Sequence, residues 1–154
     1  MKIKKILPIL LCIVTGVAMS ELMFKQYDTK TTEPVLRETV SKDVYFAQIG
    51  VYSKEENMRK SLNNIKNYIF EIKDKKYYAY VGIASSNKNI EKIKGYYQSN
   101  GYNIYIKQHT IQNSSFIEVL KQYEKLLDKT NDATSIETIA SQIISKYEEL
   151  VKTD

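Results

Sequence analysis

The chain has 154 residues, of which 23 are Lys or Arg and 18 are Asp or Glu, so its net charge is +5. Its single Cys excludes an intramolecular disulfide, and its single His, His109, excludes a metal cluster built from several histidines. Only two of the basic residues are Arg, which disfavours phosphate recognition by clustered guanidinium groups. The composition therefore favours a binding protein over an enzyme, with no metal and no other cofactor.

The N-terminus predicts a membrane segment. Three lysines lie within residues 1–5, and residues 6–24 then supply 19 mostly apolar residues, close to the roughly 20 that span a bilayer core as a helix. Positive charge before the apolar run places the N-terminus in the cytoplasm and the bulk of the chain outside it. We therefore expect a single-pass anchor in residues 1–24. A cleaved signal peptide and a lipoprotein modified at Cys12 are alternatives, and both also export the chain.

Residues 25–43 are polar, contain Pro34 and show no clear period, so they are expected to form a linker. The region from 44 to 109 then alternates strand and helix patterns. Its predicted elements are a strand at 44–52, a helix with an apolar stripe at Met58, Leu62 and Ile65, strands at 68–72 and 76–83 around an Asp74-Lys75 turn, a helix with a stripe at Ile90, Ile93 and Tyr97, and a strand at 102–109. This β-α-β-β-α-β order predicts an α+β, ferredoxin-like fold, with a four-stranded antiparallel sheet and two helices on one of its faces.

Residues 110–154 predict a C-terminal helical hairpin. Apolar residues recur at helical spacing in both halves, and Ser115 and Thr134 each precede a Glu by three residues, which is typical of a helix N-terminus. Charge separates along the chain: residues 44–109 hold 11 Lys or Arg against 5 Asp or Glu, whereas residues 110–154 hold 5 against 8. The sheet region is therefore basic and the hairpin acidic.

Strand alternation predicts which side chains gather on the sheet face that the two helices leave open. The side chains placed there are Phe46 and Gln48 on the first strand, Tyr78, Tyr80 and Gly82 on the third, and Tyr105 and Lys107 on the fourth. A shelf of tyrosine rings with an amide and a lysine suits a flat, hydrogen-bonding polymer. In the alternative arrangement the C-terminal hairpin folds over this face and the tyrosines belong to the core.

Three segments carry a resemblance to a known family. Residues 45–62 (YFAQIGVYSKEENMRKSL) join a Gln-x-Gly strand to an aromatic residue and a helix, residues 77–83 (YYAYVGI) contain Val-Gly, and residues 89–102 end in Asn-Gly-Tyr. In order and spacing these segments resemble the SPOR domain, the sporulation-related repeat, over residues 44–109. The hairpin lies outside the resemblance.

The resemblance implies binding to bacterial peptidoglycan, specifically to glycan strands stripped of their stem peptides, in cell division, sporulation or wall remodelling. Gln48 then corresponds to the glutamine of the family's first strand. Two positions depart from the family pattern: Tyr78 stands where an Arg is common, and Ile83 stands where Pro follows Gly. Removal of stem peptides leaves a carboxylate on each muramic acid, with which Lys76 and Lys107 are expected to pair.

Two other classes of partner fit parts of the sequence. An RNA-recognition module has the same element order, but Tyr77 replaces the first Gly of its strand signature and an exported domain meets little RNA, so no nucleic acid is expected. A membrane-tethered protein-binding module is the second alternative, because the spacing of the C-terminal helices also suits a coiled coil or self-association.

Overall fold

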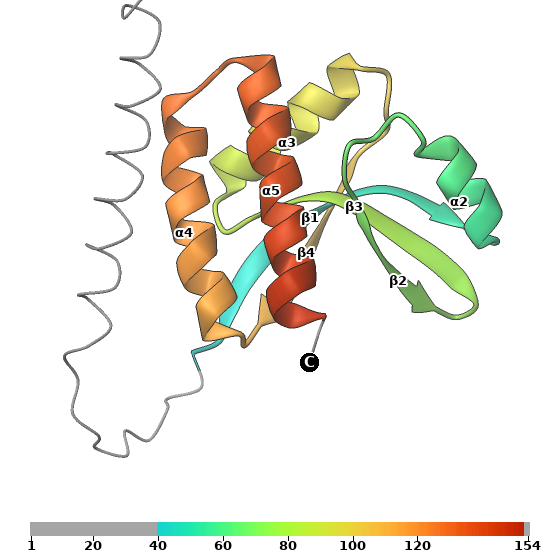
Figure 1. Cartoon of the computed structure of the whole chain (residues 1–154), viewed down its shortest axis with the longest axis horizontal. Coiled ribbons are helices and arrows are strands. Elements are labelled where there is room, and N and C mark those ends of the chain that lie inside the picture. Colours follow the sequence, from blue (N-terminus) through green and yellow to red (C-terminus); the bar gives the residue numbers. More distant parts are fainter. Residues whose placement is uncertain (1–39, 153–154) are drawn as a thin grey trace, which may run out of the picture. The chain divides into compact units, whose positions relative to one another are not determined.

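The structure, a computed structural model, describes residues 40–152. Its elements are β1 (Lys42–Tyr52), α2 (Glu55–Ser61), β2 (Ile69–Lys73), β3 (Lys76–Ala84), α3 (Asn87–Ser99), β4 (Tyr105–Ile111), α4 (Ser114–Lys129) and α5 (Ala133–Val151) (Figure 1). The strands form one antiparallel sheet in the order β2-β3-β1-β4. The predicted α+β order and the C-terminal helical hairpin are thereby confirmed, and these residues belong to one compact unit.

The predicted membrane anchor at residues 6–24 lies outside the described residues. Within residues 40–152 no helix has the length and apolar character needed to cross a bilayer. The predicted linker ends too late, because β1 already begins at Lys42. Asp43 holds the start of β1 against β4, since its carboxylate accepts hydrogen bonds from Gln108 Nε2 at 3.1 Å and Thr110 Oγ1 at 2.6 Å.

Local conformation explains where several elements begin and end. Asp74 and Lys75 have φ values of 51° and 60°, so the β2-β3 hairpin turns through two left-handed residues. Gly101, with φ 86°, follows α3. The two C-terminal helices begin earlier than the Ser115 and Thr134 patterns predict. Their caps are Asn113 and Asp132, whose side chains accept hydrogen bonds from the amides of Phe116 and Ser135, respectively.

Irregular pairing between β1 and β3 changes which residues share a face. The register shifts between Ala47 and Gln48 and again between Gln48 and Gly50. The prediction that Gly82 lies on the same face as Tyr80 is therefore wrong. A Cβ on Gly82 would lie 2.6 Å from Ile93 Cγ2 of α3, so Gly82 faces α3, whereas Tyr80 pairs with Gln48 on the opposite side.

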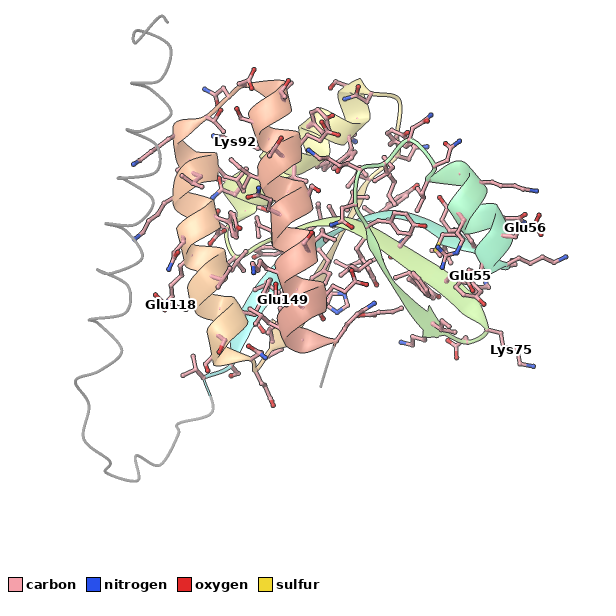
Figure 2. All side chains as sticks on the ribbon, in the orientation of Figure 1. Glu55, Glu56, Lys75, Lys92, Glu118 and Glu149 are labelled. Atoms are coloured by element: carbon pink, nitrogen blue, oxygen red, sulfur yellow. The ribbon has the colours of Figure 1, made fainter. Side chains whose placement is uncertain are left out.

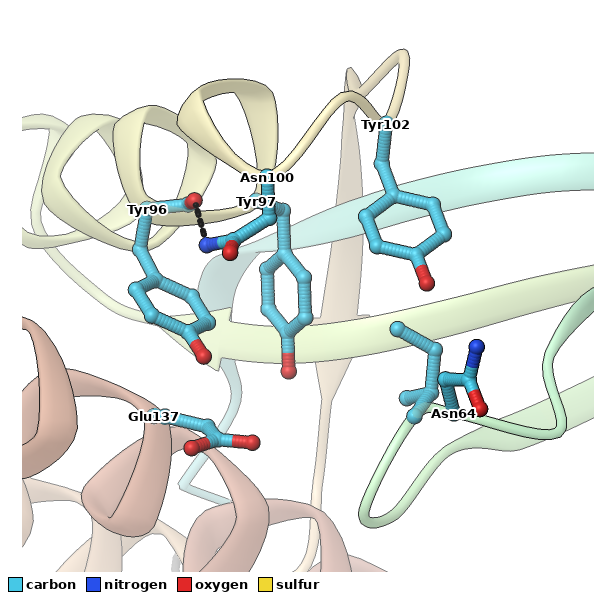
Figure 3. Close-up of a pocket in the computed structure, with 7 residues that line it drawn as sticks. Asn64, Tyr96, Tyr97, Asn100, Tyr102 and Glu137 are labelled. Atoms are coloured by element: carbon cyan, nitrogen blue, oxygen red, sulfur yellow. Dashed lines mark hydrogen bonds between the residues drawn. The ribbon is translucent and has the colours of Figure 1, made fainter.

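The last helix contacts two separate parts of the sheet region. Near its start, Glu137 lies beside Tyr96 of α3 (Figure 3). Near its end, the Tyr147 ring lies 5.4 Å from the ring of Phe46, on the sheet face opposite α3. Between these points Asn67, in the loop before β2, donates hydrogen bonds to the Ser141 carbonyl at 3.2 Å and to Ser145 Oγ at 2.5 Å. The hairpin is thus part of the core.

A buried carboxylate joins α4 to the start of α3. Glu124 is 9% exposed and accepts hydrogen bonds from the amides of Ser85 and Ser86 at 2.7 and 2.9 Å, and from the Ser85 hydroxyl. Nearby, Lys92 of α3 donates to the carbonyls of Leu127 and Thr130 at the end of α4. A negative charge is favourable at a helix N-terminus, where backbone amides lack partners within the helix.

Replacing Glu124 should therefore destabilise the fold. We expect Glu124→Ala to lower the free energy of unfolding by about 2–3 kcal/mol, because two backbone donors lose a charged acceptor in a buried place. Urea unfolding followed by circular dichroism measures this change. Glu118→Ala is the matched control, since Glu118 projects from the same helix and, among the described residues, contacts Lys121 alone, in an exposed ion pair (Figure 2). Equal loss in both variants would contradict the proposed role of Glu124.

Candidate functional site

Strand register brings the six predicted site residues to one side of the sheet, here called the Gln48 face. Gln48 pairs with Tyr80 of β3 on one side and with Tyr105 of β4 on the other. Phe46 pairs with Lys107, and Glu71 of β2 pairs with Tyr78. Residues directly opposite each other in antiparallel strands point to the same face. The predicted clustering of Phe46, Gln48, Tyr78, Tyr80, Tyr105 and Lys107 is therefore present in the fold.

The C-terminal hairpin covers one end of this face. The Phe46 side chain is fully buried, with ring centroids 5.4 Å from Tyr147 of α5, 4.4 Å from His109 and 5.3 Å from Tyr80. Phe116 of α4 packs behind Tyr147 at 5.2 Å. Phe46 is thus a core residue, and the expectation that it contacts a ligand is wrong. The apolar stripe of α5 is stable only when it is buried, and this end of the sheet is the surface against which it packs.

Beyond the covered end, the face holds a hollow of about 300 Å³, here called the Gln48 hollow. Tyr80 and Gln48 are almost fully buried, Tyr78 is half-buried and Lys107 is exposed. Tyr105 does not line the hollow, but this residue is 60% exposed on the same face. The residues that line it are Gln48, Glu71, Lys73, Tyr78, Tyr80, Lys107, Gln108 and His109.

Four of these lining residues were not predicted as site residues. Glu71 and Lys73 come from β2, whose alternation places them on the face of Tyr78, so the same parity argument that selected Tyr78 identifies them. His109 pairs with Val44 on β1 and touches Phe46. Its place at the end of the predicted strand at 102–109 gave no sign that it lines the hollow. Gln108 pairs with Tyr45, so strand parity assigns it to the other side of β4.

Several polar groups in the Gln48 hollow have no hydrogen-bond or ion-pair partner in the part of the chain that the structure describes. Within residues 40–152 the Gln48 side-chain amide forms no hydrogen bond, although this residue is only 6% exposed. The ammonium groups of Lys73 and Lys107 likewise form no ion pair with the described residues. Amides at such depth are normally hydrogen-bonded to protein or water. The Gln48 donors and acceptor are therefore available to water or a ligand.

The charge state of the phenol beside Gln48 follows from its surroundings. Burial, with a smaller contribution from the Glu71 carboxylate, raises the pKa of Tyr80 to about 12. The same two causes raise the pKa of Tyr147. Tyr80 therefore stays a neutral phenol that can donate a hydrogen bond throughout the physiological pH range.

Chemically, the hollow combines two amides, two phenols, two ammonium groups, one imidazole and one carboxylate. This set can hydrogen bond to hydroxyl and amide groups and can attract a negative charge on a ligand. In residues 40–152 no group of three His, Cys, Asp or Glu side chains is placed to hold a metal ion.

The structure is similar to one described as the solution structure of the peptidoglycan binding domain of the B. subtilis cell wall lytic enzyme CwlC. The two chains share 23% sequence identity, and the match covers 48% of this chain and 99% of that one with a TM-score of 0.43. No protein-family model matches the chain, and no curated protein matches it.

Proposed function

We propose that the Gln48 face binds the glycan strands of peptidoglycan. The observation that carries the proposal is the unpartnered amide of Gln48, which lies nearly buried in a hollow between tyrosines and lysines. Sugar rings present alternating hydroxyl and C–H surfaces, which amides and tyrosine rings can bind together. The resemblance of residues 44–109 to SPOR domains supports the same substrate, since Gln48 matches that family's glutamine.

The size of the hollow suits part of a polymer. Its volume of about 300 Å³ is at the lower end of the roughly 300–1,000 Å³ typical of small-molecule sites. We infer that one sugar ring enters it and that neighbouring sugars lie along the sheet. The exposed ring of Tyr105, on the edge strand β4, offers such a neighbour a flat surface. Phe46, sealed by Tyr147, takes no direct part.

Lysines around the hollow suit a glycan that carries carboxylates. Lys73 and Lys107 line it without a carboxylate partner in the described residues, and a denuded strand has one carboxylate on each muramic acid. Tyr78 replaces the arginine common in the SPOR family at this position. In this chain we therefore assign charge recognition to the two lysines and ring stacking to Tyr78. The role is one of binding, without catalysis.

The alternative partner, a protein bound by the C-terminal helices, has less support. Both apolar stripes are used within the chain, because Leu120, Leu127, Ile143 and Ile144 are fully buried. Leu126, which is 50% exposed, is the large apolar residue that the described part of the hairpin leaves open. A single such residue does not make an interface.

Sedimentation with purified peptidoglycan sacculi tests the main proposal. We expect residues 38–154 to be retained, and retained more strongly after an amidase removes stem peptides. Gln48→Ala and Tyr78→Ala should each weaken retention by about three- to tenfold, the loss expected for one hydrogen bond or stacking contact. Gln48→Ala should change the melting temperature little, because within residues 40–152 no group forms a hydrogen bond with that amide.

Tyr123→Ala is the matched control for Tyr78→Ala, since Tyr123 is a half-buried tyrosine on α4 outside the hollow. It should bind sacculi like the unchanged chain once folded protein is counted. Unchanged retention in both Gln48→Ala and Tyr78→Ala would contradict the assignment to the Gln48 face. Absence of any retention would favour the protein-partner alternative.

Ionic strength should also change the affinity. If Lys107 attracts muramic acid carboxylates, retention on amidase-treated sacculi should fall as salt rises, because ions screen exposed charges. Lys107→Ala should weaken retention at low salt by about two- to fivefold and reduce its salt dependence. Lys125→Ala removes an exposed lysine of α4 and should change neither quantity. Identical salt dependence in the two variants would exclude Lys107 from the site.

We further propose that residues 6–24 anchor the chain in the cell membrane, with the N-terminus in the cytoplasm and the binding face toward the wall. A cysteine introduced by Thr31→Cys in a Cys12→Ser background should react with a membrane-impermeant maleimide on intact spheroplasts. Labelling only after lysis would place residues 25–154 in the cytoplasm and would rule out wall binding.

A further inference from the structure

A second hollow lies on another part of the chain, between the end of α3, the first turns of α5 and the loop before β2. It has a volume of about 180 Å³ and is here called the Glu137 hollow (Figure 3). No residue lines both hollows. The residues that line it are Asn64, Ile65, Tyr96, Tyr97, Asn100, Tyr102 and Glu137.

The sequence around the end of α3 brings three tyrosines together. Tyr97 belongs to the buried stripe of the helix and is 2% exposed. Tyr96, the residue before it, lies on the side toward Glu137 of α5 (Figure 3). The positive φ of Gly101 reverses the chain and returns Tyr102 to the same cluster. The ring centroids of Tyr96 and Tyr102 lie 5.0 and 6.3 Å from that of Tyr97, with interplanar angles of 77° and 75°.

Oxygen atoms from these side chains face the Glu137 hollow. The hydroxyl groups of Tyr96 and Tyr97 point toward the Glu137 carboxylate, which approaches from α5 (Figure 3). Asn100 donates its Nδ2 to the Tyr96 carbonyl at 2.8 Å, so its Oδ1 remains an acceptor. The hollow thus presents several acceptors around one carboxylate.

The hollow is electrically negative although the chain has a net charge of +5. Glu137 is the charged residue of its lining and is only partly exposed. It forms no ion pair with the described residues. Burial, with Glu137 as a further cause, raises the pKa of both Tyr96 and Tyr97, which leaves both phenols neutral. Because its hydrogen-bond partner, the Tyr96 phenol, is uncharged, the carboxylate can still pair with a cation.

We propose that the Glu137 hollow binds a primary ammonium group at the end of an aliphatic chain, as in a lysine side chain. Its volume is well below the roughly 300 Å³ at which sites for whole small molecules begin, so it suits a single side chain. An ammonium is compact and has three donors, which Glu137 and the phenol and amide oxygens can accept. Ile65 and the tyrosine rings would contact its methylene groups, and the rings also favour a cation.

Nuclear magnetic resonance titration of the full-length chain in detergent solution with Nα-acetyl-lysine amide tests this proposal. We expect backbone amide shifts at Tyr96, Asn100 and Glu137 that saturate in the millimolar range. The Nε-acetylated form of the probe has the same chain without the charge and should bind at least about tenfold more weakly, the loss expected for a charge-assisted hydrogen bond. Glu137→Gln should weaken binding of the charged probe by a similar factor.

Glu118→Gln makes the same charge change on α4 and should leave binding of the probe unchanged. Tyr102→Phe keeps the ring and removes one hydroxyl, so it tests the site without altering Glu137. Equal binding of the two probe forms, or full binding by Glu137→Gln, would overturn the proposal. Retention on sacculi should be unchanged in Glu137→Gln, which separates this site from the Gln48 face and also reports that the variant is folded.

Discussion

The packing of Tyr147 on Phe46 decides how much of the sheet is available for binding. A ferredoxin-like sheet covered by helices on one side leaves its second face open along its whole length. Here the last turns of α5 and the Phe116 ring of α4 close one end of that face. The end that remains open is polar, with Gln48 and Tyr80 deep in the hollow and Lys107 exposed. One end of this face therefore packs in the core, and the other end stays open for binding.

The same helix takes part in the Glu137 hollow and in the cover over Phe46. The first turns of α5 supply Glu137 to the hollow beside α3, and its last turns supply Tyr147 to the cover over Phe46. Two contacts between segments distant in sequence hold the hairpin in place. Asn67, in the loop before β2, bonds the middle of α5, and Glu124 of α4 bonds the start of α3. Small, open-faced sheets bury little surface by themselves, and the hairpin adds the missing burial.

The charge distribution suits two ligands of opposite sign. Lysines without carboxylate partners in the described residues lie around the Gln48 hollow, and a carboxylate without a cation lies in the Glu137 hollow. Exposed ion pairs elsewhere, such as Arg59 with Glu55, are adjacent helix residues that stabilise the fold little. The charges expected to act on partners are those that lack such a neighbour in residues 40–152 and also line a hollow.

Sequence patterns by themselves determined the order of strands and helices, the Asp74-Lys75 turn and the shared face of the six predicted site residues, because periodicity and turn chemistry are local. They also indicated that the hairpin helices are amphipathic, but not which surface buries their stripes, since that depends on contacts between distant segments.

Only the tertiary structure showed that Phe46 lies beneath Tyr147. Only it showed that the β1-β3 irregularities turn Gly82 toward α3, because a bulge reverses alternation without a clear mark in the sequence. The meeting of Glu137 with Tyr96 and Tyr97 was equally beyond sequence reasoning, since about 40 residues separate them and packing alone brings them together.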